Sequence, residues 1–280
     1  MSELDLILTS LAVTLVGMTL AWVVCSRLRN VGLIDIFWGS GFAVIAVFSW
    51  TLTEHHTAAG GLAVLATCVW GLRLTIHLAR RNIGQPEDYR YAEMRRRYGE
   101  RFWWISLPLV FWLQGLLMWV IALPIQVGLA SRIDWHPLRL CGFAVWLAGL
   151  AFEAIGDWQL MRFKSNPANR GQVMRGGLWR YTRHPNYFGD FLVWWGLYGM
   201  VVEPQSWWWT WVSPALMTFL LVRVSGVRLL EKSLSSRLDG YAEYVATTSP
   251  FLPMPPGWWP RIKPRRRSAC ESNRGSREES

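Results

Sequence analysis

Residues 176–190 read Gly-Gly-Leu-Trp-Arg-Tyr-Thr-Arg-His-Pro-Asn-Tyr-Phe-Gly-Asp and stand at the junction between a basic loop and a long apolar run. Charged groups at the edge of a bilayer are costly unless they bind something. Pro185 suits the first turn of a helix, and a helix start gathers free N–H groups that attract anions. The stretch therefore predicts a membrane helix whose entrance binds phosphate. The structural alternative is a positive-inside anchor that only flanks the helix.

The composition is that of a membrane protein. The chain has 280 residues, of which 52% are hydrophobic, with 20 Trp and a mean hydropathy of +0.17. A membrane-spanning helix needs roughly 20 apolar residues, so residues 1–255 fit one all-α, multi-pass transmembrane domain of about seven helices. Residues 256–280 are polar and basic, which predicts a disordered cytoplasmic tail.

Seven apolar runs are candidate membrane spans. They cover residues 6–25, 33–52, 59–79, 105–130, 138–160, 187–203 and 207–230. The loops between them alternate in charge: residues 80–101 and 161–186 are rich in arginine, whereas residues 53–56 contain no Lys or Arg. This alternation predicts the N-terminus outside and the C-terminus in the cytoplasm. It also accounts for the net charge of +10, so no nucleic-acid partner is expected.

Several familiar kinds of site are missing from the sequence. The four cysteines, Cys25, Cys68, Cys141 and Cys270, form no C-x-x-C pair, so neither a disulfide framework nor a metal site is expected. There is no G-x-G-x-x-G after a strand, no Walker-type loop, no H-E-x-x-H and no G-x-S-x-G. Any nucleotide must therefore be held by loops and helix ends beside the membrane.

Two predicted spans carry ionisable side chains at helical spacing. Run 59–79 and its end carry Arg73, His77 and Arg80, and run 138–160 and its end carry Glu153, Asp157 and Lys164. Each set shares one helix face, and a further acid, Asp35, opens the second span. Intramembrane ionisable residues are candidates for a functional site inside the bundle. The alternative is mutual pairing, for example of Arg73 with Asp35 or Glu153, but the surplus of basic groups favours an anionic guest.

These motifs resemble the bacterial branch of the steroid 5-alpha-reductase-like family. The resemblance covers roughly residues 30–255 and rests on residues 71–73, 80–82, 87–91, 157–164, 177–190, 229–232, 241–244 and 249–253. The Arg-His-Pro-Asn-Tyr core, residues 183–187, is shared with a related family, the isoprenylcysteine carboxyl methyltransferases. The resemblance favours a bacterial inner membrane as the location.

The reductase resemblance implies a seven-helix enzyme that binds NADPH from the cytoplasmic side. Such enzymes reduce a carbon–carbon double bond conjugated to a carbonyl in a lipid-like substrate. In that family a Glu and a Tyr polarise the substrate carbonyl, and the nearest matches here are Asp35 and His77, a departure at both positions. We therefore expect Asp35 and His77 to be the catalytic residues, while the identity of the lipid-like substrate and the oligomeric state stay open.

The expected cofactor pocket combines the motif residues with the basic loops. The resemblance implies that Asp157, Asn186 and Asp190 face the cofactor and that Lys164 and Arg90 hold its phosphates. Charge-assisted hydrogen bonds from further basic residues suit a pyrophosphate and a 2′-phosphate, and the Asn186 amide suits a carboxamide. The remaining members of the expected pocket are Arg80, Arg170, Arg180, Arg183, His184, Tyr187, Tyr241 and Tyr244.

Two other functions remain open from the sequence. The first is a membrane methyltransferase that uses S-adenosylmethionine, whose sulfonium cation needs carboxylates and aromatic rings more than arginines. The second is a non-enzymatic protein that binds membrane lipids. The arginine-rich loops and Lys164 favour NADPH over the sulfonium cofactor.

Overall fold

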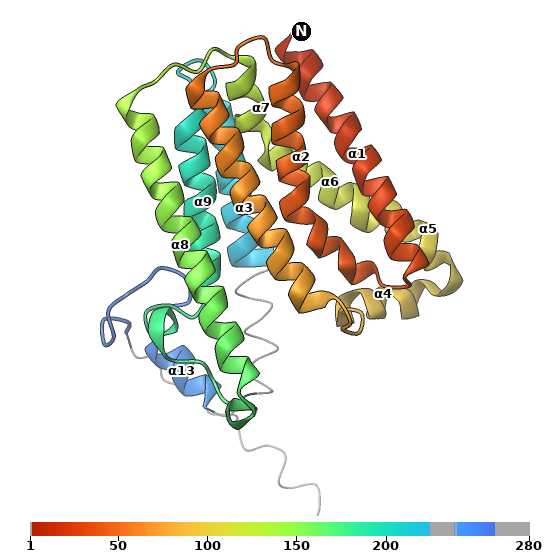
Figure 1. Ribbon diagram of the computed structural model, residues 1–280. Coiled ribbons are helices and arrows are strands. Elements are labelled where there is room, and N and C mark those ends of the chain that lie inside the picture. The colour runs from red at the N-terminus through yellow and green to blue at the C-terminus, as the bar shows by residue number, and fades with distance from the viewer. Residues whose placement is uncertain (1, 225–237, 239, 261–280) are drawn as a thin grey trace, which may run out of the picture.

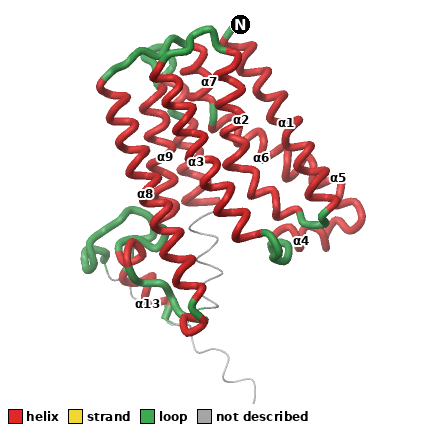
Figure 2. The backbone as a smooth tube through the Cα atoms, viewed as in Figure 1, coloured by secondary structure: helices red, strands yellow, loops and turns green. Residues whose placement is uncertain are grey.

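Long apolar runs of the sequence fold as long helices. The computed structural model describes residues 2–224, 238 and 240–260, and within this part every regular element is a helix (Figure 2). The all-α fold class is thus confirmed. The longest helices are α1 (Glu3–Arg27), α3 (Ala58–Asn82) and α8 (Pro137–Ser165), and they lie side by side with α2 (Phe37–Leu52) and α9 (Pro185–Val201) in one bundle (Figure 1).

Five helical stretches among the described residues are long and apolar enough to cross a membrane. They are Glu3–Arg27, Val31–Leu52, Ala58–Asn82, Tyr89–Ile121 and Pro137–Ser165. The predicted span 187–203 corresponds to α9, and the predicted span 207–230 begins with α10 (Trp207–Thr210), α11 (Val212–Phe219) and a π-helical segment, Leu220–Val224. The rest of that span, and the tail from residue 261 on, lie outside the described residues. The orientation in the membrane and the domain boundary at residue 255 stay predictions.

The predicted span 105–130 is a chain of short helices. It consists of α5 (Phe102–Ser106), a π-helical segment (Leu107–Trp112), α6 (Leu113–Ile121) and α7 (Leu123–Ala130). Pro108 and Pro124 lie in the first turns of the second and fourth pieces. Proline cannot donate a backbone hydrogen bond, and it displaces the preceding turn, so the run is interrupted where these residues occur.

The connections gather at two ends of the bundle (Figure 2). Helix α4 (Tyr89–Tyr98), which carries Arg95, Arg96 and Arg97 in its last turn, lies across the same end as the C-terminal ends of α3 and α8 and as α13 (Tyr241–Thr247) (Figure 1). This arginine-rich end also holds the short helical turns Val31–Ile36, Gly99–Arg101, Pro167–Asn169 and Gly177–Arg180. The N-terminus lies at the opposite end.

Glycines let two helix pairs approach to backbone contact. In α8 and α9, a Cβ on Gly149 would lie 2.6 Å from the backbone nitrogen of Val193, and a Cβ on Gly196 would overlap the backbone of Trp146. In α2 and α3, a Cβ on Gly39 would overlap the carbonyl of Gly71. Small residues at helix crossings are the usual means of close packing in membranes. Each of these antiparallel pairs therefore has a fixed register.

An aromatic cluster fills the space between the two helix pairs. The rings of Phe42 (α2) and Trp194 (α9) have centroids 4.5 Å apart, and Trp70 (α3) meets Trp194 edge to face at 5.3 Å. Phe42 and Trp70 are fully buried. Large aromatic side chains contribute much of the buried contact area in a core, so this cluster holds α3 at a defined distance from α8 and α9.

Substitution of Gly149 tests the close approach of α8 and α9. We expect Gly149→Ala to lower the free energy of unfolding by about 2–3 kcal/mol, because overpacking forces backbone shifts. Gly17→Ala is the matched control, since no heavy atom lies within 4 Å of a Cβ at that position and alanine is the better helix former. Thermal unfolding of both variants in detergent measures the difference, and equal stability would contradict the packing.

Candidate active site

Arg73 of α3 joins two carboxylates of α8. Its guanidinium forms ion pairs with Glu153 and Asp157, and all three side chains are largely shielded from solvent. Glu153 and Asp157 are four residues apart and so project from one face of α8. Charges in an apolar environment persist when they are paired and hydrogen-bonded. Arg73 and Glu153 thus form one of the pairings that the sequence left open.

Three further side chains complete this cluster around the two acids. Trp70 Nε1 donates a hydrogen bond of 2.9 Å to Glu153, and Asn186 Nδ2 of α9 donates one of 3.1 Å to Asp157 Oδ1. His77 Nε2 lies 3.6 Å from Asp157 Oδ2. Asp157 is therefore contacted by a guanidinium, an imidazole and a carboxamide that come from two different helices, α3 and α9.

Asp190 adds a third carboxylate, one helical turn after Asn186. Its side chain is half-buried, and Oδ1 is shielded from solvent without a hydrogen-bond donor among the described residues. Asp190 interacts electrostatically with Glu153, Asp157 and Arg73. Three acids thus face one guanidinium, and a shielded acceptor oxygen is left for a donor from a ligand. We use the name acid cluster for the following residues: Glu153, Asp157, Asp190, Arg73, Trp70, His77 and Asn186.

The motif that opens the sequence analysis forms a tight turn against α8. Gly177 has a positive φ of 58°, which glycine adopts at little cost. The N–H of Leu178 donates to Gln159 Oε1 at 2.9 Å, and Trp179 Nε1 donates to the carbonyl of Gly156 at 3.0 Å. Both acceptors lie in the part of α8 that carries Asp157, so the turn Gly177–Arg180 is held beside the acid cluster.

The segment after the turn is held by the C-terminal part of the chain. The N–H of Arg183 donates to the Ser249 carbonyl at 2.8 Å, and the N–H of Met254 donates to the Tyr181 carbonyl at 2.9 Å. The Arg183 guanidinium donates to the carbonyls of Val245 and Thr248, each at 2.7 Å. Arg183 therefore joins the motif to α13, and its expected phosphate contact stays a prediction.

The predicted aromatic members of the pocket are also placed near the motif. Tyr244 of α13 is buried and donates to the carbonyl of Trp179, and Tyr241 packs edge to face against it. The buried ring of His184 stacks on Tyr187, with centroids 5.4 Å apart. These contacts support the motif turn, and a contact of the four side chains with a cofactor stays a prediction.

Asp35 lies in a second network, built around α4. Asp35 Oδ2 is 3.8 Å from Arg90 Nη2, and the Arg90 guanidinium also binds Asp88 at 2.9 Å. Burial opposes ionisation of Asp88, but its hydrogen bonds with Arg90 outweigh burial and hold the pKa of Asp88 below its usual value. Within the described residues Asp35 and His77 share no hydrogen bond or ion pair. Their joint catalytic role therefore stays a prediction.

The remaining predicted basic residues lie at the arginine-rich end without acidic partners. In the described part of the chain, no ion pair is formed by Arg80, Lys164, Arg170 or Arg180. Their side chains are exposed. Cations without partners are available for an anionic ligand, in contrast to Arg90 and Arg183, which already have partners within the fold.

Four residues of the site were missing from the predicted set. Arg73, Glu153 and Trp70 belong to the acid cluster, and helical spacing had already placed Arg73 and Glu153 on the faces that meet. Arg81 interacts electrostatically with Asp35, His77, Lys164 and Tyr187, and so lies between the two networks. Arg81 lies beside Arg80 in the last turn of α3, and the sequence gave no sign of these interactions, because the direction of a long side chain cannot be derived from spacing alone.

The helical bundle with its apolar spans and interior acid cluster defines an integral membrane protein of the multi-pass helical class. The model of one family, described as "Protein of unknown function (DUF1295)", matches residues 21–248. This chain belongs to that family. No solved structure matches the chain significantly.

Curated relatives support the resemblance inferred from the motifs. The chain is 37% identical over 78 residues to "3-oxo-5-alpha-steroid 4-dehydrogenase 1" of Mus musculus, a match that covers 24% of this chain and 30% of the relative. It is 23% identical over 229 residues to the protein of the same name from Bos taurus, covering 76% of this chain and 84% of the relative. The steroid 5-alpha-reductase-like resemblance is confirmed, while the bacterial branch stays a prediction.

A methyltransferase is also among the relatives. "Probable O-methyltransferase ustE" of Ustilaginoidea virens is 37% identical over 59 residues, which cover 21% of this chain and 20% of the relative. The matched part of the chain thus covers less than a third of the length of the Mus musculus relative and a fifth of the length of the O-methyltransferase. The chain is thus similar over short stretches to both kinds of protein.

Replacement of Arg73 tests the acid cluster. We expect Arg73→Gln to lower the free energy of unfolding by about 3–5 kcal/mol, because removing one partner leaves uncompensated charge in an apolar environment. Arg132→Gln is the control: Arg132 forms an exposed pair with Asp134, and such pairs contribute about 0–1 kcal/mol. Unfolding curves of the two variants at one pH provide the comparison. A loss for Arg73→Gln no larger than that of the control would refute the pairing.

Proposed function

We propose that this protein is a membrane-embedded, NADPH-dependent reductase of a carbon–carbon double bond conjugated to a carbonyl in a lipid-like substrate. The observation that carries the proposal is the acid cluster of α3, α8 and α9 beside a set of exposed, unpaired cations at one end of the bundle. The relatives named as steroid 4-dehydrogenases support the same chemistry. The apolar surface of the spans suits a substrate that arrives from the bilayer.

The residues present fit NADPH in two respects. Asn186 donates through Nδ2 to Asp157, which leaves its carbonyl oxygen as an acceptor, and Asp190 Oδ1 is a second shielded acceptor. Acceptors of this kind suit a carboxamide and ribose hydroxyls. Lys164, Arg80 and Arg180 supply positive charge for a pyrophosphate and a 2′-phosphate. The phosphate end would thus face the arginine-rich end of the bundle.

The protein's part in the reaction is orientation and proton handling. When bound, NADPH supplies the hydride that adds to the β carbon of the conjugated double bond. As negative charge develops on the substrate carbonyl oxygen, a donor held near that oxygen stabilises it. His77 suits this task because Asp157, 3.6 Å from its Nε2, holds the imidazole in place, so that a protonated ring would present its Nδ1–H as the donor. A proton delivered to the α carbon then completes the addition of one hydride and one proton across the double bond. Asp35 is the second residue that we propose as a proton donor, besides His77.

One observation favours methyl transfer as a second candidate function. The acid cluster presents Glu153, Asp157 and Asp190 to a single guanidinium, and such an excess of carboxylate suits a sulfonium cation. The O-methyltransferase relative points in the same direction. The exposed cations without partners favour NADPH, since S-adenosylmethionine carries no phosphate for them to bind.

Location and orientation follow from charge. We propose that the arginine-rich end, with α4 and α13, faces the cytoplasm, because positively charged loops are retained on that side. A bacterial inner membrane is the expected compartment from the family resemblance. The cofactor would then enter from the cytoplasm, where NADPH is available.

Ligand-dependent stability distinguishes the two cofactors. We expect NADPH to raise the unfolding temperature of the detergent-purified protein, and S-adenosylmethionine to have no effect, since selective binding stabilises the folded state by mass action. Lys164→Gln should weaken NADPH binding about tenfold, because a hydrogen bond to a charged group contributes about 1.5–3 kcal/mol. Arg96→Gln is the matched control, as Arg96 is an exposed cation at the same end that already pairs with Glu93.

The possible outcomes of this titration are distinct. Stabilisation by S-adenosylmethionine alone would replace the reductase with a methyltransferase. Equal NADPH binding by Lys164→Gln and Arg96→Gln would remove Lys164 from the phosphate site. If neither cofactor changed the unfolding temperature, the proposal of a nucleotide-dependent enzyme would fail and a lipid-binding function would take its place.

Substitution of His77 tests the proton-handling role. We expect His77→Ala to lower kcat by about 10²–10⁴-fold, the usual contribution of a positioned acid or base, while the NADPH dissociation constant stays within about twofold. Turnover of an enone lipid and cofactor titration on the same preparation measure the two quantities. Full turnover by the variant would show that another group, with Asp35 the first to examine, donates to the carbonyl.

A further inference from the structure

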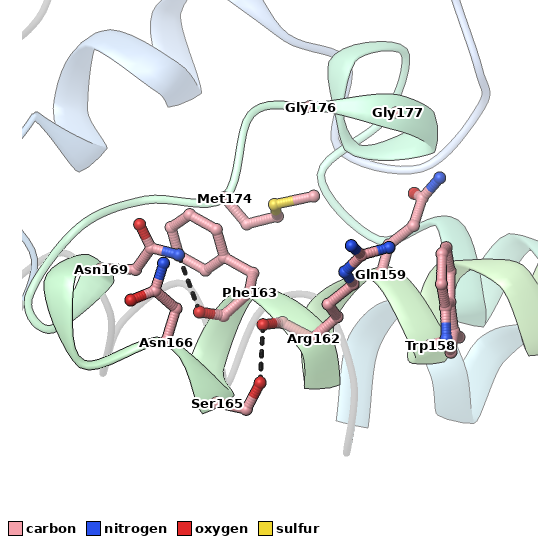
Figure 3. Close-up of a pocket in the computed structure, with 10 residues that line it drawn as sticks. All are labelled: Trp158, Gln159, Arg162, Phe163, Ser165, Asn166, Asn169, Met174, Gly176 and Gly177. Carbon is pink, nitrogen blue, oxygen red and sulfur yellow. Dashed lines mark hydrogen bonds between the residues drawn. The ribbon is translucent and has the colours of Figure 1, made fainter.

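A hollow lies beside the C-terminal turns of α8 (Figure 3). By helical spacing, its lining residues Trp158 and Arg162 are on the face of α8 opposite to Glu153 and Asp157. It has a volume of about 600 Å³ and lies between the C-terminal turns of α8 and the segment Met174–Gly177. Figure 3 shows the Met174 side chain extended over this space, with Arg162 and Gln159 on the facing helix. Neither Glu153 nor Asp157 lines it, so it is distinct from the candidate active site.

One face of α8 leads from apolar surface into this hollow. Ile155, Trp158, Arg162 and Asn166 follow one another at spacings of three and four residues and so share a helix face. Ile155 and Trp158 are 45% and 51% exposed although they belong to an apolar span. Arg162 and Asn166 lie beyond them at the arginine-rich end. Along this face an apolar residue is followed by a Trp and then by a cation and an amide. This order matches the bilayer interior, the interface and the headgroup layer.

Arg162 provides the charge of the hollow. Its guanidinium lies 5.5 Å from the centroid of the Trp158 ring, and within the described residues it forms no ion pair. No acidic residue occurs between positions 161 and 186. A guanidinium held by a cation–π contact with an indole keeps N–H groups free for an oxyanion, so Arg162 is available to an anionic ligand.

Amide groups line the floor of the hollow. Asn166 accepts from the N–H of Ala168 through Oδ1 at 3.0 Å, which leaves its Nδ2 as a donor. Asn169 Nδ2 and Ser165 Oγ each donate to backbone carbonyls, those of Phe163 and Arg162. The polar end of the hollow thus offers a cation and an amide donor, a combination that suits a phosphodiester.

We propose that this hollow binds the headgroup of an anionic phospholipid, with an acyl chain lying along Ile155 and Trp158. Arg162 and Asn166 hold the phosphate, and Trp158 sits at the level of the glycerol backbone. The site does not depend on the proposed reductase activity. It touches the motif through Gln159, which lines the hollow and accepts from Leu178, so the bound headgroup also supports the motif turn.

Lipid binding to the full-length, lipid-depleted protein in detergent tests this site. Phosphatidylglycerol, phosphatidylcholine, inorganic phosphate and NADPH are titrated separately, with bound lipid counted by native mass spectrometry and stability followed by thermal unfolding. We expect phosphatidylglycerol alone among the first three to bind to this site and raise the unfolding temperature. Arg162→Gln should weaken that binding about fivefold, since one cation near an anionic lipid contributes about 1 kcal/mol.

Matched variants keep the result interpretable. Arg96→Gln removes another exposed cation at the same end and should leave phosphatidylglycerol binding unchanged, whereas Trp158→Leu should weaken it and Arg162→Lys should retain most of it. Equal binding of phosphatidylcholine, or equal binding by Arg162→Gln and Arg96→Gln, would overturn the proposal. Protection by inorganic phosphate alone would show a site for a free anion. Competition between NADPH and phosphatidylglycerol for Arg162 would assign the hollow to the cofactor and overturn the lipid site.

Discussion

The ion pairs of Arg73 with Glu153 and Asp157 fix the relation between the two halves of this bundle. On one side, α2 and α3 are locked together by backbone contact at Gly39 and Gly71, and on the other, α8 and α9 are locked by their own glycines. The guanidinium joins these two rigid pairs at one point. A charge in an apolar environment cannot be left without a partner at small cost, so alternative registers between the pairs are disfavoured.

The chemistry of the site follows from this constraint. Once α3 and α8 are held at Arg73, His77 and Asp157 come together one turn further along, and Asn186 reaches Asp157 from the start of α9. The aromatic cluster of Phe42, Trp70 and Trp194 excludes water on one side, while the arginine-rich end remains open to solvent on the other. The ionic centre therefore has one apolar side and one solvent-accessible side, as the proposed reaction between a lipid and a charged nucleotide requires.

Much of this arrangement could be predicted from the sequence, and the exceptions have physical causes. Helical spacing placed Arg73 and Glu153 on faces that meet, and Pro185 marked the start of α9. The partners of Arg183 could not be foreseen, because they are backbone carbonyls, which every residue carries and no motif records. The contact of Asp35 with Arg90 rather than with His77 depends on how α4 packs across the bundle end, and composition does not determine the packing of a short amphipathic helix.

The hydrogen bonds between the motif segment and residues 245–254 have a consequence for biosynthesis. The carbonyls of Val245, Thr248 and Ser249 and the N–H of Met254 all bind the segment Tyr181–Arg183, some 60 to 70 residues earlier in the chain. During translation the membrane helices α1 to α9 are therefore complete well before the wall of the site beside the motif can form. The nascent protein passes through a stage in which its helices are inserted but its arginine-rich end is unfinished. That wall closes only when residues 245–254 leave the ribosome, so premature termination before residue 245 would yield an inserted helical bundle without it.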